Sequence, residues 1–284
     1  MPSRPARAPA SNPIGRTTRP SAKVIAVMTL PASCPPGRRR PARLVPTQSR
    51  SGAEQMALDA LLLEQSCSGG SDALILRFYQ WRRPTLSLGR HQGPPTEQWR
   101  QLAAAGDLDL VRRPSGGGAV LHAGGLTYAL IWADPPRQRR QAYAQVNQCL
   151  QEGLEVLGLH LKPGVASATT IVADCFAQST TADLVDSGGC KRIGSAQFWK
   201  RGHLLQHGEI PLDPHEGLWE AVFASSPPRW TPSAPSPASL ELALKQSFQT
   251  LNPGLNWREE DLSQEEIRQM DKLTTRYCLE PDQA

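Results

Sequence analysis

Apolar residues follow two patterns along the chain, one typical of helices and the other typical of strands. Residues 56–63 form an apolar run, and Ser51 and Glu54 just before it have the spacing of a capping box, so a helix is expected to begin near residue 51. Short apolar runs that are bounded by Pro, Gly or polar residues predict strands. We expect strands at residues 74–79, 85–88, 108–111, 125–132, 183–186, 190–198 and 203–211, with a turn at 187–189 that joins two of them in a hairpin.

Helical spacing of apolar residues recurs between and after these strands. A helix is expected at residues 141–157, because Gly158 is the kind of residue that commonly follows a helix C-terminus. Residues 225–239 contain five Pro and five Ser and are expected to form a loop. Further helices are expected at residues 97–105, 240–251 and 263–277. Strands that cluster together, with helices at their periphery, predict an α+β domain with a mixed β-sheet flanked by helices.

The N-terminal segment has a different composition from the rest of the chain. Residues 1–46 contain ten Pro together with many Arg, Ser and Ala. Such a segment buries too little apolar surface to offset the loss of chain entropy. We therefore expect a disordered, basic tail at residues 1–46 and one folded domain at residues 47–284. The tail is rich in Arg and free of acidic residues, which is typical of organelle transit peptides, although a dispensable extension has the same composition.

The net charge of +5 comes from the N-terminal segment. Residues 1–50 contain ten basic and no acidic residues, whereas the remaining 234 contain 21 basic and 26 acidic residues. The body of the protein therefore lacks the basic excess of a nucleic-acid-binding face, and a nucleic-acid partner is not expected there. The cations of the tail leave salt-dependent binding to phosphates open. No apolar stretch reaches 18 residues, so we expect neither a transmembrane helix nor a membrane partner.

Cysteine usage indicates the compartment. The chain of 284 residues has six Cys, and no two of them form a C-x-x-C pair. This density is too low for a disulfide scaffold, and the spacing does not fit a structural zinc site. We expect no metal and a cytoplasmic, reducing location.

A glycine-rich stretch, residues 112–122 (RRPSGGGAVLH), is the first candidate for chemistry. Three consecutive glycines after a strand allow the backbone to approach a ligand closely, and the two Arg could neutralise a phosphate or carboxylate. The stretch is neither a Walker A loop nor a dinucleotide-binding fingerprint, because the sequence after the glycines is strand-like. Composition alone fits a flexible hairpin turn equally well.

The complete stretch resembles a motif of the lipoate–protein ligase A and octanoyltransferase family, which is related to biotin protein ligases. The family has R-R-x-[ST]-G-G-x-[AG]-V-x-H before a T-Y-S-like strand, here at residues 126–129. Four other family blocks occur along the chain in the family's order. Before the glycine stretch lie an opening helix at residues 56–59 and strands at 75–89. After it lie G-x-K-[IV]-x-G-[SN]-A-Q at 189–197 and [LQ]-H-G-S-[IL] at 205–210. The resemblance covers roughly residues 51–213. It implies a biotin/lipoate protein ligase-like catalytic domain with a class II synthetase-like fold.

The resemblance also implies a set of site residues. The family's glycine loop lines an acyl pocket and, in ligases, cradles the acyl-adenylate. Lys191 is similar to the family's lysine, a cation that stabilises negative charge developing on an acyl or phosphoryl oxygen. The implied substrate-binding residues are Arg113, Ser115, Gly116, Gly117, Gly118, Ala119, Val120, Leu121, His122, Gly194, Ser195 and His207.

Cys175 indicates which reaction class applies. In the ATP-dependent ligases this position resembles an N-D pair followed by a strand. In the octanoyltransferases of the glycine-cleavage carrier type it resembles C-F, as in Cys175-Phe176 here, and that Cys is the nucleophile. A thiolate can take an acyl group from a thioester and pass it to a lysine amine. The alternative is an inert, buried Cys. His122 and His207 are the candidate acceptors of the thiol proton, although a His on a strand is more often a hydrogen-bonded core residue, and the base stays open.

We therefore expect a protein acyltransferase that acts without a cofactor. It would move an octanoyl, or a lipoyl, group from an acyl carrier protein through Cys175 to one lysine of a lipoyl-domain protein, such as the glycine-cleavage H protein. The alternative is an ATP-dependent lipoate–protein ligase that forms lipoyl-AMP and needs ATP and Mg²⁺. A non-catalytic lipoyl- or biotinyl-binding scaffold is a third reading.

Three features bear on the choice between transferase and ligase. Gly118 occupies the third glycine position, as in the ligases, where the matching transferases often have Arg. Ala123 follows His122, where both groups usually have Asp, which puts the role of His122 in doubt. The residues after position 213 leave little room for the small C-terminal domain that ligases commonly carry.

Overall fold

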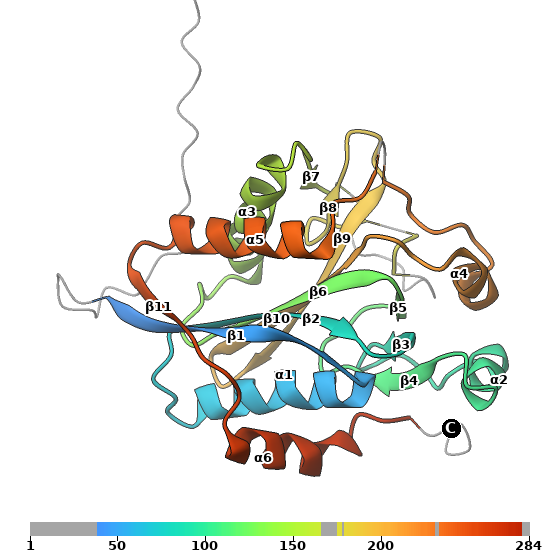
Figure 1. Ribbon diagram of the computed structural model, residues 1–284, viewed down its shortest axis with the longest axis horizontal. Coiled ribbons are helices and arrows are strands. Elements are labelled where there is room, and N and C mark those ends of the chain that lie inside the picture. Colours follow the sequence, from blue (N-terminus) through green and yellow to red (C-terminus); the bar gives the residue numbers. More distant parts are fainter. Residues whose placement is uncertain (1–38, 166–174, 178, 231–232, 280–284) are drawn as a thin grey trace, which may run out of the picture.

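The computed structural model describes residues 39–165, 175–177, 179–230 and 233–279, and within these ranges the chain forms two sheets that are flanked by helices (Figure 1). The large sheet has eight strands in the order β11-β1-β2-β6-β10-β9-β8-β7. Its strands are β1 (Arg40–Arg50), β2 (Leu74–Trp81), β6 (Gly125–Trp132), β7 (Lys162–Pro163), β8 (Leu184–Val185), β9 (Lys191–Lys200), β10 (His203–Pro211) and β11 (Leu255–Glu259).

The large sheet is mixed. β1 pairs in parallel with both β11 and β2, whereas β2, β6, β10, β9, β8 and β7 pair in antiparallel fashion. β8 and β9 form the hairpin expected across residues 187–189, and β9 also pairs with β10, with Phe198 opposite Leu205 and Ala196 opposite His207. This register is important for the site, because it places residues of both strands on the face that the glycine loop approaches.

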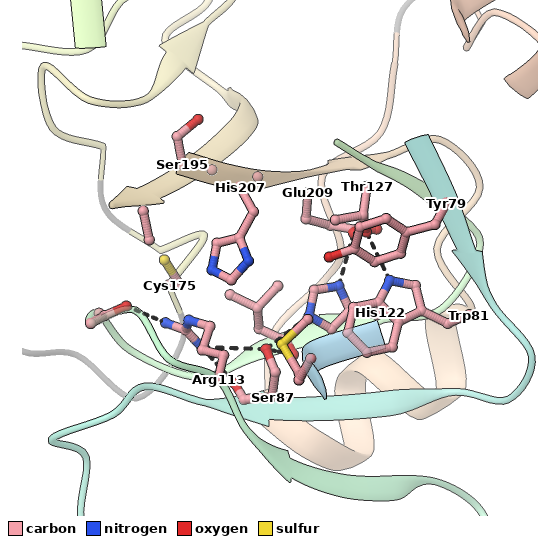
Figure 2. Close-up of a pocket in the computed structure, with 17 residues that line it drawn as sticks. Tyr79, Trp81, Ser87, Arg113, His122, Thr127, Cys175, Ser195, His207 and Glu209 are labelled. Carbon is pink, nitrogen blue, oxygen red and sulfur yellow. Dashed lines mark hydrogen bonds and ion pairs between the residues drawn. The ribbon is translucent and has the colours of Figure 1, made fainter. Parts of the chain in front are cut away.

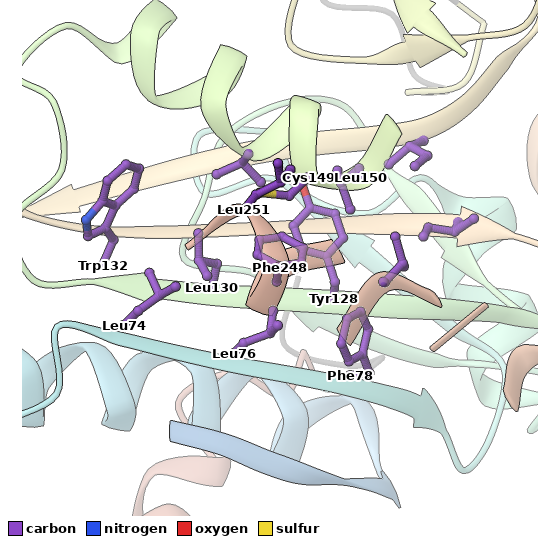
Figure 3. Packing of buried hydrophobic residues seen from close by; sticks show 14 of the residues in the cluster. Leu74, Leu76, Phe78, Tyr128, Leu130, Trp132, Cys149, Leu150, Phe248 and Leu251 are labelled. Atoms are coloured by element: carbon purple, nitrogen blue, oxygen red, sulfur yellow. The ribbon is translucent and has the colours of Figure 1, made fainter. Parts of the chain in front are cut away.

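Helices cover both faces of the large sheet. α3 (Arg139–Glu155) and α5 (Pro237–Leu251) lie on one face, and α1 (Gly52–Cys67) and α6 (Gln264–Thr274) lie on the other (Figure 1). Figure 3 shows the first interface, where strand residues such as Trp132 and Tyr128 pack against Phe248 of α5 and Leu150 of α3. Burial of these side chains supplies the main stabilising free energy of the domain, at about 1.5–3 kcal/mol per large apolar side chain.

The small sheet carries the glycine loop. Its order is β4-β3-β5, with β3 (Thr85–Leu88) between β4 (Asp109–Arg112) and β5 (Val120–His122). It packs with α2 (Glu97–Ala104) and α4 (Glu216–Phe223) through a separate apolar cluster that includes Leu86, Leu121, Trp99 and Trp219. The loop between β4 and β5 is therefore held on a small rigid platform beside the large sheet.

The predicted α+β class with a mixed sheet and flanking helices is confirmed. The strands expected at residues 85–88, 125–132 and 203–211 have the same bounds in the structure, and the capping box that starts α1 is present, with Ser51 accepting from the Glu54 amide. Other elements differ by a few residues at their ends. The sequence patterns missed β1, β7, β11 and α4, whereas β5 lies directly after the glycines, where the sequence is strand-like.

The N-terminal boundary expected after residue 46 is wrong by several residues. β1 begins at Arg40 and lies between β11 and β2, where Ala42, Leu44 and Val45 are buried. Pro46 lies where the β1–β2 register shifts, which is where a strand tolerates a residue without an N–H group. The Pro- and Arg-rich composition concealed this strand. Residues 1–38 of the expected tail lie outside the described residues.

In the part of the chain that the structure describes, no helix is long and apolar enough to cross a membrane.

Candidate active site

The glycine loop is shaped from within by Arg113. The Arg113 guanidinium donates hydrogen bonds to the carbonyl oxygens of Ser87 at 2.7 Å, Gly116 at 2.7 Å and Gly118 at 2.6 Å. Gly117 has a φ of +98°, and a Cβ atom there would lie 2.9 Å from Arg113 Nη2, so the position requires glycine. Burial lowers the pKa of Arg113. Its donors are occupied by backbone carbonyls, which makes it a support of the loop as well as part of the wall.

A cavity lies between this loop and the strands β6, β9 and β10, with about 460 Å³ of empty space that is partly open to solvent (Figure 2). It is lined by Met56, Tyr79, Trp81, Ser87, Arg113, Gly116, Gly117, Val120, His122, Thr127, Cys175, Gly194, Ser195, Ala196, His207, Gly208 and Glu209.

Nine of the residues expected at the site line this cavity. They are Arg113, Gly116, Gly117, Val120, His122, Cys175, Gly194, Ser195 and His207. Five expected residues do not line it, but four of these touch residues that do. Ser115 binds His207, Gly118 accepts from Arg113, Ala119 accepts from the Cys175 amide, and Lys191 contacts Cys175. Leu121 faces the opposite side of β5 and packs in the small-sheet core, as strand alternation dictates.

Cys175, which lines the cavity, is in contact with Lys191 just outside the lining. Lys191 Nζ lies 3.5 Å from Cys175 Sγ and donates to the Cys175 carbonyl oxygen at 2.7 Å. Asp183 holds this cation through an ion pair of 3.0 Å and also accepts from the Ser195 amide. Both charged side chains are buried, where Coulomb attraction is stronger than in water. A cation in this position can stabilise negative charge on the sulfur or on an acyl oxygen.

Phe176 fixes the segment that carries Cys175. The Phe176 ring packs edge-on against Trp219 of α4 with ring centroids 5.8 Å apart, and Lys191 Nζ lies 5.2 Å from its centroid. The Cys175 amide donates to the Ala119 carbonyl at 3.0 Å. The thiol is therefore held from two sides, by the small-sheet core and by the end of the glycine loop.

His207 belongs to a buried chain of polar side chains. Its Nδ1 donates to Asp59 Oδ2 at 3.0 Å, and its Nε2 accepts from the Ser115 hydroxyl. Asp59 also forms an ion pair of 2.6 Å with Arg77. Burial alone would raise the pKa of Asp59, but Arg77 and His207 outweigh burial and hold it below the usual value. Both nitrogens of His207 are thus engaged, and it orients Ser115 at the start of the glycines.

His122 occupies the opposite end of the cavity from Cys175 (Figure 2). Its Nδ1 donates to Glu209 at 2.8 Å, its Nε2 binds the Ser87 hydroxyl at 2.8 Å, and its ring stacks on Trp81 with centroids 3.9 Å apart. Glu209 stands where the family strand has Ser, and it supplies a carboxylate beside His122 although Ala123 has replaced the usual Asp. Among the described residues, no hydrogen bond joins His122 or His207 to the Cys175 thiol, so the structure gives no support to either as its base.

Several residues in the cavity lining or in contact with it were not selected from the sequence, although two of those in contact with it, Asp59 and Arg77, carried a signal. Asp59 lies within an apolar helical run, and Arg77 lies within an apolar strand. Opposite charges that each occur in a buried segment predict a buried ion pair, because an unpaired charge there is costly. Ser87, Thr127 and Glu209 carried no comparable signal. Within the described residues, no three His, Cys, Asp or Glu side chains are grouped so as to hold a metal ion.

Stability is expected to fall between pH 7 and pH 5 through His122. Burial lowers the pKa of His122, and Arg113 and His207 add to this effect while Glu209 opposes it. The unfolded chain therefore binds a proton near pH 6.5, whereas the folded protein remains neutral at this position to lower pH, so stability rises with pH in this window. Denaturant unfolding from pH 5 to pH 7.5 checks this, and His122→Gln should flatten the profile. An equal slope in that variant would contradict the assignment.

Comparisons with known proteins agree with this geometry. Residues 51–237 match the family model described as the lipoyl protein ligase A/B catalytic domain. The chain is 37% identical over 175 residues to octanoyltransferase LipM of Carboxydothermus hydrogenoformans, covering 60% of this chain and 64% of that protein. It is 35% identical over 193 residues to octanoyltransferase LipM of Anoxybacillus flavithermus, covering 64% and 69%. The matches thus span about two thirds of these relatives.

Solved structures show the same fold. A lipoate protein ligase described as putative, from T. acidophilum with bound lipoic acid, has a TM-score of 0.69 and 21% identity, covering 83% of this chain and 95% of that chain. Lipoate-protein ligase A bound with ATP has a TM-score of 0.67 and 20% identity, covering 84% and 95%. At these identities the likeness concerns the fold.

Proposed function

The chain belongs to the lipoyl protein ligase A/B catalytic domain family, and from this premise we propose that it transfers an octanoyl group to a lysine of a lipoyl-domain protein through a thioester on Cys175. The observation that carries the proposal is the position of the thiol. Cys175 lines the cavity with its sulfur 3.5 Å from Lys191 Nζ. The relatives named octanoyltransferase LipM support the choice of acyl group.

The proposed chemistry has two acyl transfers. The Cys175 thiolate attacks the carbonyl carbon of the donor thioester, the new C–S bond forms, and the donor's C–S bond breaks to release its thiolate, which takes up the proton that Cys175 lost. The neutral amine of the acceptor lysine then attacks the Cys175 thioester, the C–N bond forms, and the C–S bond breaks, and the released Cys175 thiolate takes up the proton that the amine loses. Lys191 stabilises the oxyanion in both steps.

The donor thioester is already activated, so this route needs no ATP. We propose an acyl carrier protein as the donor and a lipoyl-domain protein, such as the glycine-cleavage H protein, as the acceptor. We place the reaction in the cytoplasm, because Cys175 must remain a thiol and reducing compartments keep thiols free. The described cysteines Cys67, Cys149, Cys175 and Cys190 are free.

The ligase reading has less support at residue level. Its N-D pair precedes a strand, but no strand follows Cys175 directly. The strand β8 begins at Leu184, directly after Asp183, so Ala182-Asp183 is the better counterpart of that pair. The Asn is then absent, and the acidic residue binds Lys191.

Intact-mass measurement after incubation with octanoyl–acyl carrier protein, without ATP, tests the proposal. We expect one octanoyl adduct, located on Cys175 by peptide mapping, and its disappearance when apo lipoyl-domain protein is added. Lys191→Met should slow adduct formation, because the oxyanion loses its cation. An enzyme that forms no adduct but modifies the acceptor with lipoate and ATP would be a ligase, and the proposal would fail.

A further inference from the structure

A cationic groove borders the glycine loop beside the acyl cavity. Five cations line it: Arg90, Arg112, Arg113, Lys200 and Arg276. Arg90 lies over the Phe198 ring, 5.0 Å from its centroid. Burial raises the pKa of Tyr277, which also lines the groove, whereas the charges of Arg276 and Arg90 oppose this rise, so both Arg lie near the phenol. The groove therefore combines positive charge with aromatic surface.

Most of this positive charge is not neutralised by the protein. Glu64 is the one acidic side chain of the lining, and it pairs with Lys200 and Arg201. Among the described residues, no carboxylate forms an ion pair with Arg90 or Arg276. The Arg112 guanidinium is engaged by the protein, because it donates to the backbone carbonyls of Gly89, Gln92 and Gly93. Several Arg elsewhere on the surface are paired, as in Arg82–Glu54, Arg83–Asp109, Arg229–Glu216, Arg258–Asp72 and Arg268–Glu265. This contrast, in a body with an acidic excess, indicates a site for an anion.

The groove is connected to Cys175 through shared elements. Arg113 lines both the groove and the acyl cavity, Pro114 lines the groove, and Gly116 lines the cavity. The Arg90 amide donates to the Ser115 carbonyl at 2.8 Å, which joins the groove to the glycines. Along β9, Ala196 lines the cavity, and Phe198 and Lys200 line the groove on the same face of the strand. At the usual rise per residue of a strand, Ala196 and Lys200 are about 13 Å apart.

We propose that this groove binds the acyl donor, a small acidic carrier protein whose thioester is attached through a phosphodiester-linked arm; the inference rests on the function proposed above. The phosphodiester and the acidic surface of the carrier match the unpaired cations. The arm is flexible, so its thioester can pass over the glycine loop to Cys175 while the phosphodiester stays in the groove. The aromatic surface of Phe198 and Tyr277 accommodates the uncharged part of the arm.

The test compares two donors. The first is octanoyl–carrier protein, and the second is the octanoyl thioester of N-acetylcysteamine, which lacks both the phosphate and the protein. In the full-length double variant Arg90→Glu/Arg276→Glu, we expect the rate constant kcat/KM for acylation of Cys175 by the carrier to fall by about tenfold or more. Acylation by the small thioester should stay within about twofold. The proposal would be overturned if kcat/KM for acylation fell with both donors, or if it fell with neither.

The matched control is Arg137→Glu/Arg140→Glu, which makes the same charge change on exposed residues at the start of α3, on the other face of the large sheet. It should leave both donors unchanged. Fluorescence anisotropy with labelled, unacylated carrier protein measures binding without chemistry. If the wild-type enzyme binds the carrier and the groove variant binds it equally well, or if the groove binds only nucleic acid, the groove is not the donor site. If neither donor acylates Cys175, the proposed function is wrong. The anisotropy measurement still shows whether the groove binds the carrier protein.

Discussion

Replacing Cys175 by alanine is expected to abolish octanoyl transfer, with a fall in kcat/KM of roughly 10³-fold or more. In the proposed reaction the Cys175 thiol, which lies beside Lys191, is the nucleophile, and without it the acceptor amine would have to attack the donor thioester directly. Both proposed substrates are proteins, so the cavity would have to receive two macromolecules at once. Steady-state octanoylation of a lipoyl-domain acceptor, followed by mass spectrometry, measures the loss.

The matched control is Cys190→Ala. Cys190 adjoins Lys191 in sequence and is also half-buried, but it does not line the cavity, and burial raises the pKa of its thiol. This variant should retain activity within about twofold. Cys175→Ser separates the two readings of the chemistry, because a ligase that forms an adenylate would keep its ATP-dependent activity in this variant. A transferase would lose turnover, since an alcohol is a weaker nucleophile and a poorer leaving group than a thiol.

Replacing Arg77 by methionine is expected to lower the free energy of unfolding by about 3–5 kcal/mol. Arg77 lies 2.6 Å from Asp59, and both side chains are almost completely buried. Methionine fills similar space but leaves the Asp59 carboxylate in the interior with only His207 and Tyr79 as partners. A loss of this size lowers Tm by roughly 6–20 °C for a domain of this length.

Thermal unfolding followed by circular dichroism measures this change. Arg229→Met is the control, because the Arg229–Glu216 pair is exposed and surface pairs contribute about 0–1 kcal/mol. The double variant Asp59→Asn/Arg77→Met should recover part of the loss, since the uncompensated charge is removed. If Arg77→Met is no more destabilising than Arg229→Met, the buried pair does not hold α1 against β2.

The sequence predicted the elements whose patterns depend on local chemistry. The capping box at Ser51 and the apolar strand at Gly125–Trp132 were both read correctly, because each signal lies within a few adjacent residues. β1 was missed because its burial depends on β11, which lies more than 200 residues away in the sequence and pairs Arg40 with Leu255. The local composition of this segment, with two Pro and several Arg, predicted a disordered segment instead of a buried strand.

The candidate site was predicted in part. The motifs identified the glycine loop, Cys175 and Lys191, because these residues occur at fixed spacing. The roles of the individual side chains depend on three-dimensional neighbours that spacing does not reveal. Arg113 proved to bind loop carbonyls, and His122 proved to be held by Glu209 and Ser87. Asp183, which holds Lys191, lay in an expected strand with no signal for a charged partner.

The polar chain through Asp59 also determines when the pocket can form during folding. The contact of Asp59 with His207 spans 148 residues, and that of Ser115 with His207 spans 92. Closing such long loops costs chain entropy before any contact stabilises them, so contacts of this kind form late in folding. Refolding experiments should therefore recover catalytic competence with the final, slowest phase, after most helical structure has returned.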